Sequence, residues 1–455
     1  MPVVGKMAFN EDDRSSWFSH KAEIASPHYY QVYLSEHDVL AELTTTERAA
    51  SFRFTFPESE ESYIVVDALD MESYIKILED EQMIIGYSSK NAGFAPSNFK
   101  NYFVITFDKP FKLGKTFSDG KLNDEITEVS SEHVGGIVSF STKRGEKIHV
   151  NVASSFISIE QAKLNLREVL GQSFDDTVEQ GRMAWNSVLG RIDVESDSET
   201  KLKTFYSCLY RSLLFPRKFY EINASNEIVH YSPHTGEICD GYMYTDTGFW
   251  DTFRCLFPLL NLVYPEVNKE VQEGLINTYK ESGFFPEWQS PGQRDCMIGN
   301  NSASVLVDAY MKGIRVEDIN SLYEGLVHGT ENVHETILST GRLGHEYYNK
   351  LGYVPCDVGI KENAARTLEY AYDDWCIWKL AKELGKPKKE IDKFAKRAFN
   401  YKNLFDEETK LMRGKCKNGK FVTPFSPFKW GDSFTEGNSW HYTWSVFCLL
   451  YTSPS

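Results

Sequence analysis

The chain changes its hydrophobic period once, near residue 157, and this change constrains its fold more than any other feature. Over residues 29–155, apolar and polar residues alternate in short runs, and Phe52, Phe54 and Phe56 are one such run. A period of two indicates half-buried strands. Turn signals such as Asp108-Lys109-Pro110 separate the runs. We therefore expect an antiparallel β-sandwich of about eight strands in this half of the chain.

From residue 158 onward the apolar residues recur at helical spacing, and Gly or Pro separates the predicted helices. One apolar stripe, from Val267 to Tyr279, begins after Pro265 and ends before Gly283, which is the usual asymmetry of helix ends. About seven helices are expected after the connector, over residues 202–213, 265–282, 302–312, up to 326, 362–384, 389–405 and from 438 onward. Helices in series joined by long loops predict an (α/α)6 toroid, and about seven helices are too few to close it.

These patterns predict a multi-domain β plus α protein. The 455 residues exceed one typical domain of about 100 to 200 residues. We expect an N-terminally truncated β-sandwich domain over residues 1–157, a helical connector over 158–196, and a C-terminally truncated, incomplete (α/α)6 toroid carrying the catalytic site over 197–455.

Composition excludes several classes of protein. A hydrophobic fraction of 41% with 25% charged residues is typical of a globular protein rather than a disordered one. No apolar run approaches the roughly 18 residues that a membrane span needs, and residues 1–10 lack a signal-peptide pattern. A net charge of −16 argues against nucleic-acid binding. The eight cysteines form no CxxC pair, so we expect mostly buried free thiols, with one or two disulfides possible in an oxidising compartment.

Polar and aromatic residues gather in four loops between the predicted helices, over residues 244–254, 283–288, 294–300 and 434–442. Loops on a rigid scaffold are where sites are usually built. A glycosidase needs a carboxylic acid held protonated near aromatic surface, and a second carboxylate. Glu436 lies between Phe434 and Trp440, so we expect desolvation to raise its pKa. No catalytic triad, phosphate-binding loop or dinucleotide motif competes with this interpretation.

Taken singly, each of these residues also has a purely structural interpretation. Thr435, just before Glu436, could cap a helix whose dipole favours the acidic residue. Asp251 and Arg254 are three residues apart and could form an ion pair on a helix surface. Asp374 could hydrogen-bond a neighbouring loop. Only the loops taken together favour a carbohydrate active site.

Long motifs in a fixed order also carry a resemblance to a known family. They include FSHKAE at 18–23, AELT at 41–44, RFTF at 53–56, WDTFR at 250–254, CMIG at 296–299, GYVP at 352–355, LEYAYDDW at 368–375 and TEGN at 435–438. With these motifs the chain resembles glycoside hydrolase family 92, a family of calcium-dependent exo-acting α-mannosidases with an inverting mechanism.

The resemblance implies a β-sandwich packed on an (α/α)6 toroid, hydrolysis of α-mannoside glycans, and Ca²⁺ as cofactor. It places Glu436 on the general acid, and Trp250 and Asp251 on residues that hold the sugar. Arg294 is assigned to the same subsite by its loop. The resemblance assigns no calcium ligand in this chain. It also implies an extracellular or periplasmic location.

Two departures from the family pattern lead to further expectations. The family's general base comes from an acidic segment well downstream of the Glu-Gly-Asn motif, and this chain ends at Ser455. A family segment with a second sugar contact has no counterpart before Phe18. We therefore expect an incomplete copy that lacks the base and has little or no activity. Two alternatives stay open: another inverting glycosidase or phosphorylase of this architecture, or a non-catalytic carbohydrate-binding relic.

Overall fold

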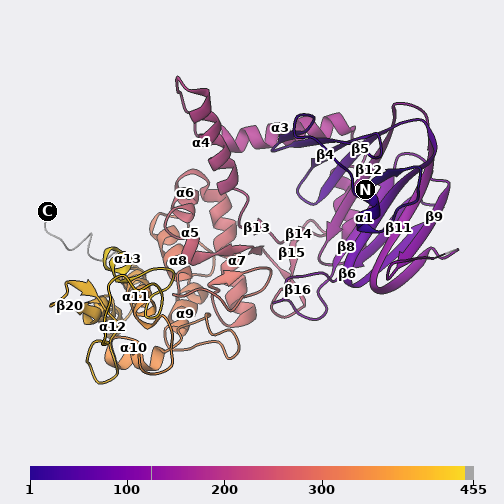
Figure 1. Cartoon of the computed structure of the whole chain (residues 1–455). Helices are drawn as coiled ribbons and strands as arrows, with labels where there is room; N and C mark the ends of the chain where they lie inside the picture. Colours follow the sequence, from indigo (N-terminus) through magenta and orange to yellow (C-terminus); the bar gives the residue numbers. More distant parts are fainter. Residues whose placement is uncertain (124, 446–455) are drawn as a thin grey trace. The chain divides into compact units, whose positions relative to one another are not determined.

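The computed structural model describes residues 1–123 and 125–445, which form two compact units. The first unit comprises Met1–Leu213, Glu221–Tyr231 and Gly236–Asp240. The second comprises Leu214–Tyr220, Ser232–Thr235 and Gly241–Ser455. Figure 1 shows strands as the main elements of the first unit and helices as those of the second.

The first unit is built on one antiparallel sheet. Its strands are β1 (Pro2–Val4), β2 (Ile24–Ser26), β3 (Tyr29–Leu34), β4 (Val39–Thr45), β5 (Ala49–Phe56), β6 (Ser59–Leu78), β7 (Met83–Ser88), β8 (Asn101–Phe107), β9 (Leu113–Ser118), β10 (Lys121–Asn123), β11 (Glu128–Thr142) and β12 (Glu146–Ser155). The strand order is β10-β9-β11-β6-β7-β8-β12-β5-β4-β3-β2, and β1 pairs with β6. The antiparallel β domain is confirmed, with twelve strands rather than eight. The extra strands include β1, β2 and β10, which are too short to show a period.

The sheet folds over so that its two halves share one core. Val39 of β4 and Val138 of β11 belong to the same buried cluster, although their strands are far apart in the strand order. The alternation predicted for β5 is present, since Phe54 and Phe56 are both buried in this cluster. Burying one such side chain contributes about 1.5–3 kcal/mol, so the alternation decides which face of the strand points inward.

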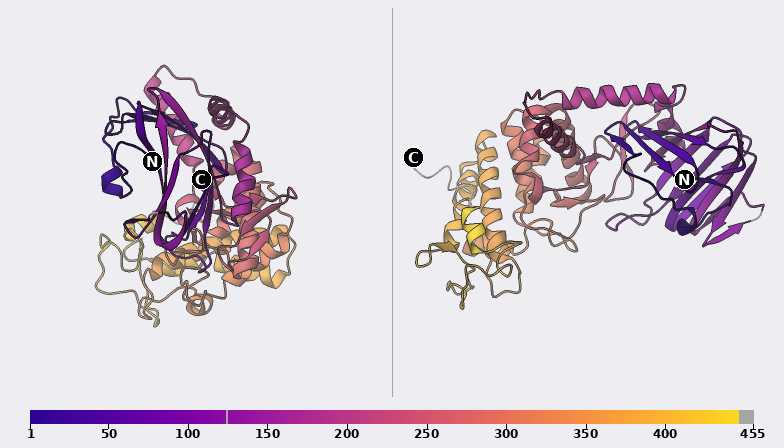
Figure 2. Two further views of the ribbon diagram at one scale, coloured as in Figure 1. Left: turned by 90° about the vertical axis from the view of Figure 1, so that its right-hand side faces the viewer. Right: turned by 45° about the horizontal axis from the view of Figure 1, so that its top comes forward.

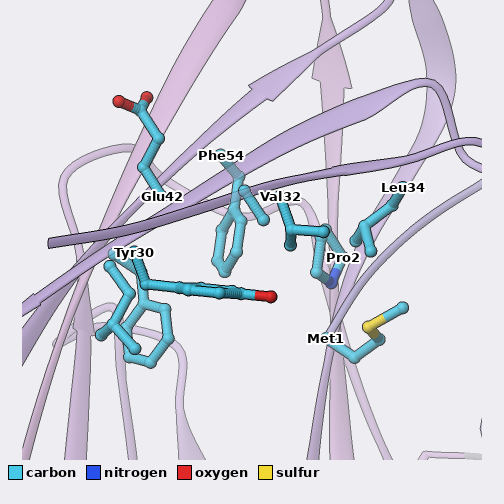
Figure 3. A pocket seen from close by; sticks show the side chains of 10 residues that line it. Met1, Pro2, Tyr30, Val32, Leu34, Glu42 and Phe54 are labelled. Carbon is cyan, nitrogen blue, oxygen red and sulfur yellow. The ribbon is translucent and has the colours of Figure 1, made fainter. Parts of the chain in front are cut away.

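A shallow hollow on β3, β4 and β5 has an almost wholly apolar lining. Its walls come from Met1, Pro2, Tyr30, Val32, Leu34, Ala41, Glu42, Leu43, Phe52 and Phe54. Figure 3 shows the carboxyl group of Glu42 pointing away from the ring of Tyr30. That carboxylate accepts hydrogen bonds from Arg53 Nη2 at 2.6 Å and Arg53 Nε at 2.7 Å. The hollow therefore offers no unpaired carboxylate to a sugar.

The helices predicted after the sheet are present in the first unit. They are α2 (Ile159–Asn165), α3 (Phe174–Leu189) and α4 (Glu199–Ser212), and the short α1 (Glu11–Arg14) precedes them. Their start points are set by side chains: Ser158 accepts a hydrogen bond from Gln161 N, and Ser173 forms a capping box with Asp176. A small sheet of β14 (Glu221–Ile222), β15 (Ile228–Tyr231) and β16 (Ile238–Asp240) completes this unit.

The second unit is mainly helical (pink through orange to yellow in Figure 2). Its helices are α5 (Phe249–Thr252), α6 (Leu256–Val263), α7 (Pro265–Ser282), α8 (Ser302–Met311), α9 (Ile319–Gly329), α10 (His345–Leu351), α11 (Asn363–Glu383), α12 (Lys388–Arg397) and α13 (Ser439–Trp444). Short strand pairs join β13 (Arg217–Lys218) to β17 (Tyr244–Thr245), β18 (Thr247–Gly248) to β19 (Trp288–Gln289), and β20 (Phe405–Asp406) to β21 (Leu411–Met412). The predicted helical domain is confirmed. The helix predicted over 389–405 ends at Arg397, and a 3-10 helix (Asn400–Leu404) follows it.

Helix α11 is the central helix of the second unit. It packs against α8, α9 and α12. Arg366, Glu369, Asp373 and Asp374 are all buried on it. Buried ionisable groups need partners, because taking a charge out of water is costly. The partners of these groups connect α11 to the loops described below.

Two further expectations concern membranes and cysteines. None of the helices in residues 1–123 and 125–445 is long and apolar enough to cross a membrane. The expectation of buried thiols is wrong for Cys208, Cys255 and Cys296, which are exposed, while Cys376 is buried. Cys448 lies outside the described residues.

Candidate active site

A two-stranded pair brings together the segments that carry the predicted sugar-binding residues. Strand β18 pairs with β19, with Gly248 opposite Trp288. Helix α5, which carries Trp250 and Asp251, begins directly after β18. On the other side of the pair, Arg294 N donates to the carbonyl oxygen of Trp288 at 2.9 Å. Trp250, Asp251 and Arg294 therefore belong to one local framework although about forty residues separate them.

Trp288 is the central side chain of this framework. A Cβ atom placed on Gly248 would lie 2.1 Å from Trp288 Cδ1, so only glycine allows the ring to lie against the backbone of β18. The guanidinium carbon of Arg294 lies 5.0 Å from the centroid of the Trp288 ring, within the range of a cation–π contact. Trp288 ends the loop over residues 283–288, but the sequence did not predict a role for it in the site. Its role depends on a strand pairing of only two residues, which carries no periodic signal.

Glu369 of α11 holds the indole of Trp250. The carboxylate oxygen Glu369 Oε1 accepts a hydrogen bond from Trp250 Nε1 at 3.4 Å, and Arg254 Nη2 lies 3.9 Å from the same oxygen. Burial raises the pKa of Glu369, and the nearby Arg254 guanidinium opposes part of that rise. Glu369 is 3% exposed, while Trp250 is half-buried. The buried carboxyl group thus orients a ring that keeps part of its surface accessible.

Two more buried carboxyl groups hold the loop of Arg294. Glu287 accepts hydrogen bonds from Asn301 N at 2.7 Å and from Asn301 Nδ2 at 3.1 Å. Asp373 accepts from Asn300 N at 3.0 Å. Asn301 is the N-cap of α8, where unsatisfied amides carry partial positive charge. The two carboxyl groups therefore fix the loop that runs from Arg294 into α8.

Burial and neighbouring carboxylates raise the pKa of two of these acidic groups, Glu287 and Asp373. Burial raises the pKa of both Glu287 and Asp373 well above the ordinary range, and the negative charges of nearby carboxylates add to it. Glu369 is one of the groups that act on each of them. All three are at most 3% exposed, so their contacts orient other residues and leave almost no surface for a ligand.

Asp374 forms the fully buried ion pair of this region. Its Oδ1 atom lies 2.6 Å from Arg342 Nη1, and its Oδ2 atom accepts a hydrogen bond from Tyr348 at 2.9 Å. Arg342 and Asp374 are both 0% exposed. The structural interpretation of Asp374, a bond to a neighbouring loop, is confirmed.

Main-chain bonds anchor the loop that carries Glu436 to the start of α11. The carbonyl oxygen of Ser433 accepts hydrogen bonds from Ala364 N and Ala365 N at 3.0 Å each. Gly431 N donates to Gly437 O at 2.8 Å and closes the loop. Glu436 itself has φ 45°, a conformation that non-glycine residues seldom adopt. The loop therefore presents Glu436 from a fixed main chain.

The burial expected for Glu436 is wrong, because its side chain is exposed. Phe434 turns into the core and stacks on Tyr442 with ring centroids 5.1 Å apart, while Trp440 is 43% exposed. Phe434 and Tyr442 belong to a buried cluster against which Trp250 also packs. The structure thus connects the loop of Glu436 to Trp250 through apolar contacts, and Glu436 points outward from them.

The helix-cap interpretation of Thr435 is also wrong. The side chain of Asn438 caps α13, accepting from Trp440 N at 3.1 Å and from His441 N at 3.3 Å. Thr435 instead accepts, through its carbonyl oxygen, a hydrogen bond from the Tyr442 hydroxyl at 2.8 Å. The cap therefore leaves Glu436 outside the helix.

No group of three or more carboxylates in the described residues is close enough to hold one calcium ion. Ca²⁺ takes six to eight oxygen ligands at about 2.3–2.6 Å. In the described part of the chain, every group of three or more His, Cys, Asp or Glu side chains close enough to hold one ion includes a cysteine sulfur. Glu287, Glu369 and Asp373 each accept a hydrogen bond from an N–H donor, while Glu369 Oε2 and Asp373 Oδ1 are buried with no hydrogen-bond partner among the described residues. The calcium ligands therefore stay unassigned.

Solved structures resemble the chain over nearly its whole length. The GH92 inverting mannosidase BT2199 from Bacteroides thetaiotaomicron is 45% identical with a TM-score of 0.95, covering 98% of this chain and 60% of that one. The GH92 α-mannosidase BT3965 from the same organism, solved with mannoimidazole, is 32% identical with a TM-score of 0.88, covering 98% of this chain and 61% of that one. An uncharacterized secreted glycosidase of Arthroderma benhamiae is 26% identical, covering 98% of this chain and 56% of its own length.

The chain spans about three fifths of the length of these relatives. Two family models match it: the glycosyl hydrolase family 92 N-terminal domain over residues 1–155 and the family's catalytic domain over residues 161–448. The order of a β domain followed by a helical domain, predicted from the change in period, is the order of these two models. The chain belongs to glycosyl hydrolase family 92.

Proposed function

We propose that the enzyme formed by this chain hydrolyses terminal α-linked mannose from glycans. The observation that supports the proposal is the pairing of β18 with β19, from which the segments of Trp250, Asp251 and Arg294 extend, together with the packing of Trp250 against the cluster that contains Phe434. The named activities of BT2199 and BT3965, and the mannoimidazole bound to the second, support mannose as the sugar. The substrate class is therefore α-mannoside glycans.

In this proposal each group has a distinct role. Glu436 donates its proton to the glycosidic oxygen as general acid, from a loop fixed by main-chain bonds to α11. Asp251 accepts hydrogen bonds from sugar hydroxyls, and Arg294, braced on Trp288, donates to them. The accessible part of the Trp250 ring stacks on the C–H face of the pyranose.

The inverting mechanism belongs to the same proposal. Inversion needs a carboxylic acid and a carboxylate base about 6.5–9.5 Å apart, with a water between the base and the sugar. Glu436 supplies the acid, and no residue of this chain is assigned as the base. Calcium is proposed as the cofactor because the chain belongs to this family.

We also propose an extracellular or periplasmic location. The relative from Arthroderma benhamiae, a secreted glycosidase, supports it.

The test compares how fast the whole enzyme hydrolyses two substrates that differ in their leaving group. Glu436→Gln should lower kcat/KM on α-mannobiose by about 10²–10⁴-fold, because the glycosidic oxygen leaves unprotonated. An aryl mannoside with a strongly acidic leaving group needs no such proton, so its cleavage should fall far less. Glu407→Gln, a change at an exposed glutamate paired with Lys410, is the matched control and should match the wild type. Unchanged hydrolysis of α-mannobiose by Glu436→Gln would refute the assignment of the acid.

A further inference from the structure

Two cysteines of the second unit meet although 60 residues separate them. Cys356 follows α10, and Cys416 lies between β21 and α13, in the segment that leads to Glu436. Their sulfur atoms are 3.0 Å apart. Both are half-buried free thiols in this structure.

Hydrogen bonds on both sides of the thiols hold the two segments together. Cys356 N donates to the carbonyl oxygen of Lys415 at 2.9 Å. The Tyr353 hydroxyl donates to the carbonyl oxygen of Cys416 at 3.0 Å. The main chains themselves are therefore adjacent, and the approach of the sulfurs does not depend on one side-chain rotation.

A third contact continues this junction beyond the cysteines. Lys417 N donates to Asp357 Oδ1 at 2.7 Å. Hydrogen bonds therefore lie on both sides of the two sulfurs along the chain. They hold the two segments together without a bond between the sulfurs.

The separation of the sulfurs favours a covalent bond over a shared metal ion. Two thiolates bound tetrahedrally to one zinc ion at about 2.3 Å lie about 3.8 Å apart. A disulfide needs about 2.0 Å, which a closing of about 1 Å achieves. Burial and the neighbouring Cys416 thiol raise the pKa of Cys356 to about 12, an environment that suits an uncharged sulfur. Asp357, the third side chain near the two sulfurs, already accepts a hydrogen bond from Lys417 N through Oδ1.

We propose that Cys356 and Cys416 form a disulfide bond in the mature protein. A donor disulfide, from a small molecule or an oxidoreductase, supplies the oxidising equivalents. One cysteine thiolate attacks the donor and expels one donor thiol; the second attacks the mixed disulfide and expels the other. The two protein thiols are oxidised to one S–S bond, and the donor is reduced to two thiols. This inference does not depend on the proposed activity.

The bond would close a segment that contains α11 and α12. That segment carries Glu369 and Asp373, and its end at Cys416 begins the run toward Glu436. Closing a loop of 60 residues restricts the unfolded chain far more than the folded one. The expected result is a higher melting temperature without a change in the folded structure.

The test uses the purified full chain after incubation with oxidised glutathione. Peptide mapping without reductant should recover the peptides of Cys356 and Cys416 joined, with the mass of two hydrogens lost. Reduction should lower the melting temperature of the second unit by about 10 °C. Cys356→Ser and Cys416→Ser should each melt at the reduced value with or without reductant. Cys208→Ser, at an exposed cysteine, is the control and should keep the full response to reductant.

Three outcomes would overturn the proposal. The first is alkylation of both thiols in the native, oxidant-treated protein. The second is one melting temperature for the oxidised wild type and for Cys356→Ser. The third is stoichiometric zinc that the wild type retains through dialysis and that either serine variant loses. The peptide map of the wild type needs no variant, so it decides the matter even if a serine variant does not fold.

Discussion

Substitutions at two adjacent aspartates of α11 should differ sharply in how much they lower the free energy of unfolding. Asp373 and Asp374 are both 0% exposed, yet only Asp374 forms a direct ion pair with the buried Arg342. Asp374→Asn keeps the shape of the side chain and removes its charge. Arg342 then loses its closest counter-charge, and breaking one side of a buried pair costs about 3–5 kcal/mol.

Asp373→Asn should be mild for the opposite reason. The pKa of Asp373 is raised well above its ordinary range, so the folded protein favours the neutral carboxyl group that asparagine resembles. The amide oxygen of asparagine can still accept the hydrogen bond from Asn300 N. We expect a change within about 1 kcal/mol, close to that of an ordinary surface substitution.

Calorimetry at neutral pH separates the two outcomes. For a unit of this size about 1 kcal/mol corresponds to about 2–4 °C, so Asp374→Asn should lower the melting temperature of the second unit by about 6–20 °C. Asp373→Asn should lower it by at most about 4 °C. Adding Arg342→Met to Asp374→Asn should recover part of the loss, since the uncompensated charge is then gone. Equal losses for the two single variants would refute this reasoning.

Three other predictions concern the same region. The raised pKa values of Glu287 and Asp373 mean that the folded protein binds protons at these two groups more tightly than the unfolded chain does. The stability that these two groups contribute is therefore complete below about pH 4 and is lost as the pH rises through their folded pKa values. Denaturant titrations should show this decline in the free energy of unfolding, and a flat profile would contradict it. Gly248→Ala places a Cβ atom 2.1 Å from Trp288 Cδ1 and should lower the free energy of unfolding by about 1–3 kcal/mol. Thermal unfolding and the near-ultraviolet circular dichroism of Trp measure the change. An unchanged melting curve would argue against the close contact. Glu369→Gln keeps a hydrogen-bond acceptor for Trp250 Nε1, so in the whole enzyme kcat/KM should fall by less than about tenfold. Glu369→Leu removes the acceptor, and kcat/KM should fall by at least about tenfold. Equal losses would show that the hydrogen bond does not position the ring.

Local signals explain which elements could be predicted from the sequence. Helix α7 begins at Pro265 and ends before Gly283, whose φ of 80° is the left-handed conformation that glycine favours. Both signals lie within the helix and its ends. Helix α10 has only seven residues between two left-handed glycines, Gly344 and Gly352, and so has no periodic pattern to detect.

The sequence nominates residues for the candidate site but does not give their geometry. Motifs pointed to Trp250, Asp251 and Glu436, and a loop pointed to Arg294. The pairing of β18 with β19 brings the segments of Trp250, Asp251 and Arg294 together. The carboxyl groups that orient them come from distant segments, and no local pattern shows which of them meet. Glu436 shows why neighbours in sequence mislead: its φ of 45° turns it outward while Phe434 turns inward.

Helix α11 sets the spacing between the loops of the candidate site. Its first turn carries the loop of Glu436, and the residues one and two turns further on brace Trp250 and the loop of Arg294. With a rise of about 1.5 Å per residue, Glu369 and Asp373 lie about 9 and 15 Å along the axis from Asn363. The rise of this one helix thus sets the spacing between the loop of the proposed acid and the residues proposed to hold the sugar. Variants altered in bond cleavage should accordingly be found along its buried face, at positions that never touch a sugar.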